Sequence, residues 1–328
     1  MLTNRTFDAP EWTSTEEFTS ISSMRVLSDG RILVADVGED ALVLLDSNGT
    51  RLSTVGRKGQ GPGEYMDGRI LSAMPNDSTR LVDPTLRRVS VFDSKLQFVR
   101  LDSLPEGIAG HVGNRVAFAS NGDVLAETFP NFPEPAKHVF LLHWSAAKGA
   151  VDTIGSLAAR QFGAGVIRRG NGPPSVMFQI VPYSPSDDWV LMPDGEVVAR
   201  RSEQHTIEWI GRSDSTKVIR ATAAPSIPVS DAERNEEVQA IRDLMPKFKP
   251  VYVAQSMMTG SDHELWMQRT AADSLSRSDW DVTDVRNGST STISFPKGYR
   301  LLLVTSNAIY TVHGDQDDIE RVSRFSRR

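Results

Sequence analysis

The sequence predicts an all-β protein, a single six-bladed β-propeller domain that spans residues 1–328. Six short turns of similar chemistry recur along the chain, each between two apolar runs, at spacings of 47, 45, 73, 68 and 45 residues. A repeat in the mid-forties with four short strands per unit is typical of a propeller blade. The two long spacings indicate insertions. The turns are Asp29-Gly30, Asn76-Asp77, Asn121-Gly122, Asp194-Gly195, Asp262-His263 and Asn307-Ala308.

Short runs rich in Val, Ile and Leu supply the strands of each blade. The pattern of 33–46 returns in 80–93, at an offset of 47 residues. Two pairs of positions are therefore equivalent, Asp36 with Asp83 and Asp46 with Asp93. The predicted strands are 21–28, 31–37, 41–46 and 51–55 in blade one, with 80–83 and 89–93 in blade two, 116–119, 124–128, 139–144 and 151–154 in blade three, 189–192, 197–201, 206–210 and 217–221 in blade four, and 253–258, 265–269, 280–285 and 291–295 in blade five.

The sixth blade has only three strands in the C-terminal sequence, at 301–305, 309–313 and 319–325. A missing outer strand would leave an open sheet edge, which closed propellers avoid. We therefore expect a segment within residues 3–18 to supply the fourth strand. This strand would close the ring by joining the two ends of the chain.

One helical insertion is predicted between blades four and five, at about residues 224–250. Ser230 and Glu233 have the spacing of a capping box, and Pro246 would end the helix. Its apolar stripe would consist of Val238, Ile241, Leu244 and Met245. Two interpretations remain open, a stripe buried against the propeller and a helix that binds a partner.

Composition excludes several classes of function. The chain has no cysteine, so it has no disulfide and no thiolate site. Its net charge of −6 gives no general attraction to nucleic acid. No apolar run is long enough to cross a membrane, and the first residues lack the apolar stretch of a signal peptide. We predict no catalytic residue, metal site or cofactor, because the six histidines are scattered and no G-x-S-x-G motif occurs.

The long connections should all lie on one face of the propeller. Strands alternate in direction, so the first-to-second and third-to-fourth turns share one face, and these turns are short. The other connections share the opposite face, and every long segment falls among them, at 57–65, 129–137, 159–183, 224–250, 270–278 and 314–318. Binding residues concentrate on loops of rigid scaffolds, so we expect the working surface on this long-loop face.

Six basic residues on this face are candidates for contact with a protein partner. They are Arg57, Lys58, Arg87, Arg88, Arg168 and Arg169. Because acidic residues share the same face, an ordinary solvated surface is the alternative. The glycine-rich run at 59–63 is a poor phosphate cradle, since no helix follows it. A tight turn between blades that buries Tyr65 explains the glycine-rich run better.

The same glycine-rich run carries a family resemblance. Residues 55–65, which contain G-P-G-E followed by an aromatic residue, resemble a loop of bacterial six-bladed β-propellers related to NHL-repeat propellers, as do 87–93 and 264–266. The resemblance implies the fold and an exported or membrane-tethered, extracytoplasmic location, such as the periplasm.

The sequence favours a non-catalytic binding or scaffold module that docks a protein partner, such as an accessory subunit of a cell-envelope or membrane-associated complex. The first alternative is a lactonase-like hydrolase with a divalent cation at the channel mouth. The second is a ligand-sensing pocket between the disc and the 230–245 helix.

Overall fold

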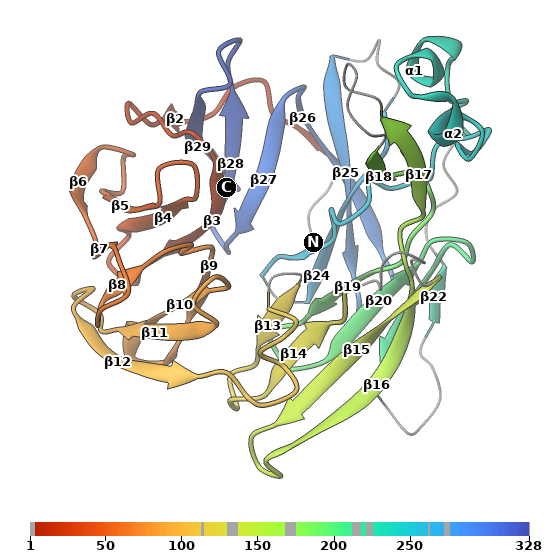
Figure 1. Cartoon of the computed structure of the whole chain (residues 1–328). Helices are drawn as coiled ribbons and strands as arrows, with labels where there is room; N and C mark the ends of the chain where they lie inside the picture. Colours follow the sequence, from red (N-terminus) through yellow and green to blue (C-terminus); the bar gives the residue numbers. More distant parts are fainter. Residues whose placement is uncertain are drawn as a thin grey trace.

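Six β-sheets follow one another around a central axis in the computed structural model of the chain (Figure 1). Strands that follow one another within a blade are hydrogen-bonded in chain order, and two short N-terminal strands add to the outer edges of blades five and six. The first strands of blades two to six line the central channel. The structure describes residues 4–112, 115–129, 137–167, 175–211, 218–220, 226–261, 263–271 and 276–327. The predicted six-bladed propeller is confirmed.

The first two blades agree closely with the predicted strands. Blade one contains β3 (Ile21–Val26), β4 (Ile32–Asp36), β5 (Ala41–Leu45) and β6 (Arg51–Thr54). Blade two contains β9 (Ile70–Ala73), β10 (Thr79–Asp83), β11 (Arg88–Phe92) and β12 (Phe98–Ser103), with a short 3-10 turn at Pro75–Asp77. Between the blades, β7 (Arg57–Lys58) pairs in parallel with β8 (Glu64–Tyr65).

Blades three and four carry the first large insertion between them. Blade three contains β13 (Val116–Phe118), β14 (Val124–Glu127), β15 (His138–Ser145) and β16 (Ala150–Ala158). Blade four contains β19 (Asp188–Leu191), β20 (Val197–Arg201), β21 (Thr206–Ile210) and β22 (Val218–Arg220). The insertion is an antiparallel hairpin of β17 (Phe162–Ile167) and β18 (Ser175–Ile180).

The N-terminal segment closes the ring at two places. Blade five contains β23 (Met258–Thr259), β24 (Glu264–Gln268), β25 (Arg277–Asp284) and β26 (Thr290–Pro296), and blade six contains β27 (Tyr299–Val304), β28 (Ala308–Gly314) and β29 (Glu320–Ser326). As predicted, blade six takes its outer strand β2 (Trp12–Thr13) from the N-terminus. In addition, β1 (Arg5–Thr6) pairs in parallel with β26, so one short segment joins two blades.

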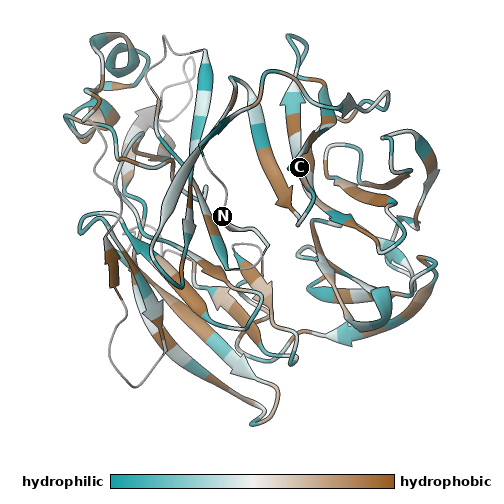
Figure 2. Ribbon diagram, turned by 180° about the vertical axis from the view of Figure 1, so that it is seen from behind, coloured by the Kyte–Doolittle hydropathy of each residue, from teal (hydrophilic) through white to brown (hydrophobic). Residues whose placement is uncertain are grey.

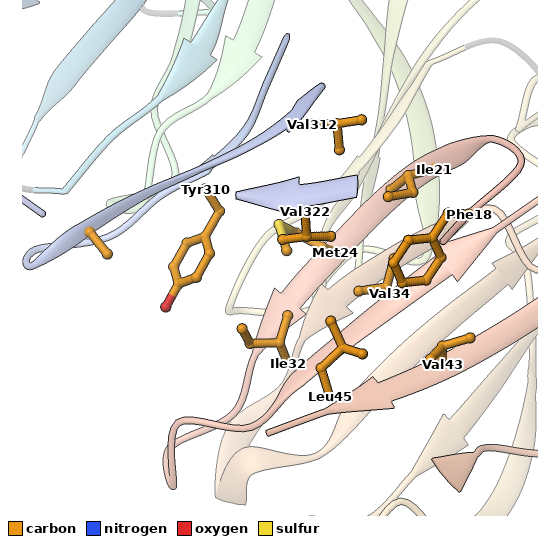
Figure 3. Close-up of a cluster of buried hydrophobic side chains, with 11 residues drawn as sticks. Phe18, Ile21, Met24, Ile32, Val34, Val43, Leu45, Tyr310, Val312 and Val322 are labelled. Atoms are coloured by element: carbon orange, nitrogen blue, oxygen red, sulfur yellow. The ribbon is translucent and has the colours of Figure 1, made fainter. Parts of the chain in front are cut away.

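A buried cluster seals the junction between the first and last blades. Figure 3 shows Phe18, Ile21 and Met24 packed near Tyr310 and Val322. Phe18 is 3% exposed, and it lies five residues after the end of β2 on the N-terminal segment. The closure is therefore hydrophobic as well as hydrogen-bonded.

The predicted equivalence of blades one and two extends to their side-chain contacts. Asp36 and Asp83 are buried, and each carboxylate accepts three backbone N–H groups. For each aspartate, two of the three donors lie in the segment just before the first strand of the blade, and the third lies in the turn that follows the aspartate. Asp46 and Asp93 each accept the N–H groups two and four residues later, which fixes a tight turn.

The alternation of strand direction places the long connections on one face, as predicted. The strands carry most of the apolar residues, and the turns are mostly polar (Figure 2). One long connection on this face was missed by the prediction, and its described part is residues 104–112. Its apolar residues Leu104, Ile108 and Val112 are buried between blades two and three.

Two sequence predictions in the second insertion were wrong in detail. The helical insertion contains two short helices, α1 (Asp231–Asn235) and α2 (Gln239–Arg242), and not one continuous helix. Of the predicted stripe, Ile241 and Met245 are buried, whereas Val238 and Leu244 are exposed. The first strand of blade five is shorter than the predicted 253–258, because the chain turns at Gln255, whose φ is +55°.

Candidate functional site

The glycine-rich loop at residues 56–65 is built around two side chains. Tyr65 is 1% exposed, and its hydroxyl donates to the Val55 carbonyl and accepts the Leu42 N–H, both at 2.9 Å. The Glu64 carboxylate accepts the Gly61 N–H at 2.7 Å and the Arg57 Nε–H at 2.6 Å, and these bonds lower its pKa. The predicted turn that buries Tyr65 is confirmed.

The glycines of this loop leave room for the Glu64 side chain. A Cβ atom at Gly59 would lie 2.2 Å from the Glu64 Oε2 atom, and one at Gly61 would lie 2.9 Å from it. The carboxylate therefore occupies the concave side of the loop, where a phosphate group would have to bind. The loop shapes the surface and is not a phosphate cradle.

The predicted contact residues lie in different environments. Arg57 is highly exposed, and Lys58 forms an ion pair with Asp40 on the same surface. Arg87 is exposed, with a φ of +50°. Arg88 donates to the carbonyls of residues 60, 61 and 64 at 2.7 to 3.0 Å, so it fixes the loop to blade two. Arg168 and Arg169 lie outside the described residues.

A buried ion pair at the mouth of the channel joins blades three, four and five. Arg115, just before β13, pairs with Asp188 at the start of β19. The Asp188 side chain is completely buried and accepts the N–H groups of Trp189 and Met257, both at 2.9 Å. Arg115 also donates to the Met257 carbonyl at 3.2 Å. Two adjacent acidic residues in a turn, such as Asp187 and Asp188, are a weak sequence signal. No motif near residue 115 indicated that Arg115 pairs with Asp188.

A second cluster of charged side chains lies beside the Arg115–Asp188 pair. Asp187 accepts the N–H groups of Ala158 and Ser202 and the guanidinium of Arg201. Arg200 is 3% exposed, and burial lowers its pKa, although the nearby carboxylates of Asp188 and Asp187 oppose this shift. These contacts tie the long-loop ends of blades three and four together.

The channel wall itself is mostly apolar. A space of about 360 Å³ is bounded by the first strands of blades two to six, including Leu71, Val116, Val190 and Leu303. No group of three or more His, Asp or Glu residues that could hold a metal ion occurs among the described residues. A hard cation takes six to eight oxygen ligands, and the described side chains of this wall offer few of them.

The two insertions pack against each other on the long-loop face and form one insertion unit, defined here as β17, β18 and residues 226–250 (Figure 1). Helix α2 lies against β17 at Gly163, where a Cβ atom would come 2.4 Å from the Ile241 Cδ1 atom. A small core of Val181, Val229 and Met245 joins the two insertions. The insertions are therefore packed elements and not independent loops.

A buried polar group joins the insertions further. Glu233 is the capping-box residue of α1, and it also accepts the Tyr183 hydroxyl at 2.6 Å and pairs with Lys249. Burial alone would raise the pKa of Glu233, but the hydrogen bonds from Lys249, Tyr183 and Ser230 lower it to about 2. The Lys249 Nζ atom lies 4.8 Å from the centre of the Tyr183 ring.

A cavity of about 270 Å³ lies between the disc and the β17–β18 hairpin. The hairpin contributes Phe162 and Ile180, and the disc contributes Arg115, Ser186 and Asp187. A pocket beneath the insertions was an open alternative from the sequence. Its outer wall is the hairpin and not the helical segment.

Comparisons with known proteins support the fold. No protein-family model matches the chain, and no curated protein sequence is significantly similar to it. A structure from Bacteroides fragilis, whose description suggests an exported protein, is similar with a TM-score of 0.55 and 11% identity over 99% of this chain and 100% of that one. A member of the DUF4221 family from Bacteroides vulgatus gives a TM-score of 0.54 and 10% identity over 98% of both chains.

A gluconolactonase from Xanthomonas campestris is less similar, with a TM-score of 0.49 and 7% identity over 94% of this chain and 88% of that one, and it carries no argument about activity. The structural neighbours are six-bladed propellers, which agrees with the predicted fold class. The relation to NHL-repeat propellers stays a prediction. No helix of the described residues is long and apolar enough to cross a membrane.

Proposed function

We propose that the chain is a non-catalytic binding module that docks a protein partner through its long-loop face. The observation that carries this function is a set of exposed apolar side chains on the insertion unit. They are Val176, Val238, Leu244 and Phe248, with exposed fractions of 62%, 49%, 40% and 54%. Exposed apolar residues gathered on one rigid unit are typical of interaction surfaces.

The insertion unit is suited to docking because it is already ordered by its own contacts. The Glu233–Lys249 pair and the packing of α2 on β17 fix its shape without a partner. Association then costs less conformational entropy than it would for a mobile loop. The four apolar side chains would provide the buried centre of the interface.

The basic residues of the long-loop face would form part of the polar rim. Arg57, Lys58 and Arg87 are accessible, and we propose that they contact acidic groups of the partner. Arg88 would act by holding the glycine-rich loop in place. Arg168 and Arg169 remain proposed contacts on the sequence prediction alone.

We further propose an extracytoplasmic location, with the propeller as an accessory subunit of a cell-envelope complex. The exported character suggested for the similar Bacteroides fragilis protein supports this location.

The test is capture of the partner by the tagged full-length chain from envelope extracts of its native host. Val238→Glu combined with Phe248→Glu places charge on the insertion unit. The matched control, Leu52→Glu combined with Val99→Glu, changes side chains of similar exposure on the outer strands β6 and β12. We expect the control to retain the partner and the first variant to lose it. Equal retention by both would remove the insertion unit from the interface.

A further inference from the structure

The cavity beneath the hairpin has apolar walls and also polar or charged lining residues, which are Arg115, Glu127, Arg160, Ser186, Asp187 and Gln255. Val139, Ala158, Phe162 and Ile180 are among its apolar residues. Val139 is 5% exposed, so the inner part of the wall is shielded from water. In small-molecule sites, apolar walls give affinity and polar groups fix the orientation of the ligand.

The acidic groups of this cavity are already engaged by the protein. Asp187 is bound by two backbone N–H groups and Arg201. Glu127 accepts the Trp189 Nε1–H at 2.9 Å. Arg115, one of the two cations of the lining, is neutralised by Asp188. These three charged groups therefore contribute little to the selectivity for a ligand.

Arg160 differs from them. It lines the cavity, yet within the described part of the chain its guanidinium makes no hydrogen bond or ion pair. Burial lowers the pKa of Arg160, and the carboxylates of Glu127 and Asp188 act on it only at longer range. A partly buried guanidinium without a bonded anion is costly, and an incoming anion would remove that cost.

Ser186 is a second polar group without a partner in the described part of the chain. The residue is 4% exposed and lines the same cavity, and its hydroxyl makes no hydrogen bond to the described residues. Buried hydroxyl groups nearly always have a partner in native proteins. Among the residues that the structure describes, the Ser186 hydroxyl and the Arg160 guanidinium both lack a partner, and each points independently to a polar ligand in this cavity.

We propose that the cavity binds a carboxylate that carries an apolar group, with the carboxylate on Arg160 and Ser186 and the apolar group against Phe162 and Ile180. The planar guanidinium matches a carboxylate by two parallel hydrogen bonds. The modest volume and the apolar walls suit a single carboxylate rather than a heavily hydrated polyanion. This site goes beyond partner docking, because the four apolar residues proposed for docking are not part of its lining.

The same chemistry could come from a free carboxylic acid or from the C-terminal residue of a polypeptide. Calorimetry of the full-length chain distinguishes the two sources with four probes. The free-acid pair is 4-phenylbutyrate and 4-phenylbutanamide. The peptide pair is N-acetyl-Gly-Gly-Phe with a free and with an amidated C-terminus. Each pair changes the carboxylate and keeps the apolar group.

We expect at least one of the two acids to bind, about tenfold or more tightly than its amide, as charge-assisted hydrogen bonds require. Binding of 4-phenylbutyrate would assign the site to small acids, and binding of the peptide acid alone would assign it to a chain terminus. Either result supports the site. An amide that binds as tightly as its acid, or no binding by either acid, would overturn it.

Variants locate the binding. Arg160→Gln should weaken the acid about tenfold or more and leave the amide unchanged. The matched control, Arg100→Gln, removes an exposed arginine from β12 and should leave acid binding unchanged. Ser186→Ala should keep the melting temperature, because the hydroxyl bonds to none of the described residues, while affinity for the acid falls severalfold. Unchanged acid binding in Arg160→Gln would contradict the assignment.

Discussion

Arg115 on blade three forms an ion pair with Asp188 on blade four, at the mouth of the channel, and the Asp188 side chain has no exposed surface. The same carboxylate accepts the Met257 N–H from the segment that enters blade five. One side chain thus joins three consecutive blades on the long-loop face.

Replacing Asp188 by Asn should destabilise the whole propeller. The change leaves Arg115 without its anion, and breaking a buried pair on one side costs about 3 to 5 kcal/mol. Urea unfolding gives the free energy of unfolding. Asp102→Asn breaks the more exposed pair with Arg100 on β12 and should cost less than about 1 kcal/mol. Similar losses in the two variants would show that the buried pair has no special role.

Removal of residues 1–18 should destabilise the fold strongly. The deletion removes β1, β2 and the buried side chains Phe7 and Phe18, each worth about 2 to 3 kcal/mol of burial. It also leaves β29 as an open edge that can pair with another chain. Calorimetry should give a lower melting temperature, and light scattering should detect association. An unchanged melting temperature would refute the closure of the ring by this segment.

Glu233→Gln should loosen the insertion unit and leave the blades intact. The variant leaves Lys249 buried without its anion, at a local cost of about 3 kcal/mol. Hydrogen exchange should rise in residues 175–180 and 226–250, with β4 and β28 unaffected. An equal increase in exchange along the whole chain of the variant would contradict a separately stabilised insertion unit.

The same pair predicts a pH dependence in the unaltered protein. The pKa of Glu233 is lowered from 4.5 to about 2, so the native state holds the charged form more strongly than the unfolded chain does. Its contribution to stability is complete above pH 4.5 and is lost as the pH falls toward 2. Protection of residues 226–250 should therefore fall over this range, and Glu233→Gln should lack that part of the change. An identical acid response in the variant would exclude Glu233 as its source.

Arg88→Ala and Arg57→Ala should differ, although the two arginines lie beside the same loop. Arg88 donates to three backbone carbonyls, so its loss should cost about 1.5 to 3 kcal/mol of stability. The Arg57 side chain is 81% exposed, and its loss should cost less than about 1 kcal/mol. Chemical unfolding measures both variants. A larger loss in Arg57→Ala would reverse the roles assigned to the two residues.

Local patterns predicted the blades because the strands and turns are specified by nearby residues. The carboxylates of Asp46 and Asp93 bond to N–H groups within the same turn, so their roles could be inferred from the repeat. The predicted missing strand of blade six was also found, since an incomplete sheet can be recognised from the sequence.

Contacts between distant residues could not be predicted in this way. Arg115 and Asp188 are far apart in the chain, and neither belongs to a motif. The prediction of a single helix was wrong because its residues bond to the hairpin. Gln179 donates to Glu237 at 2.8 Å, at the point where the helix is interrupted. A sequence pattern does not show that β18 lies beside this segment. The cavity below the hairpin depends on the same long-range packing.

Hydrogen exchange of the chain with and without its captured partner tests the docking face most directly. Binding is predicted to protect the insertion unit, residues 162–167, 175–180 and 226–250, together with the glycine-rich loop at 57–65. The tight turns on the opposite face, such as 46–50 and 93–97, are predicted to exchange at the same rate in both states. Protection confined to those turns would contradict the account.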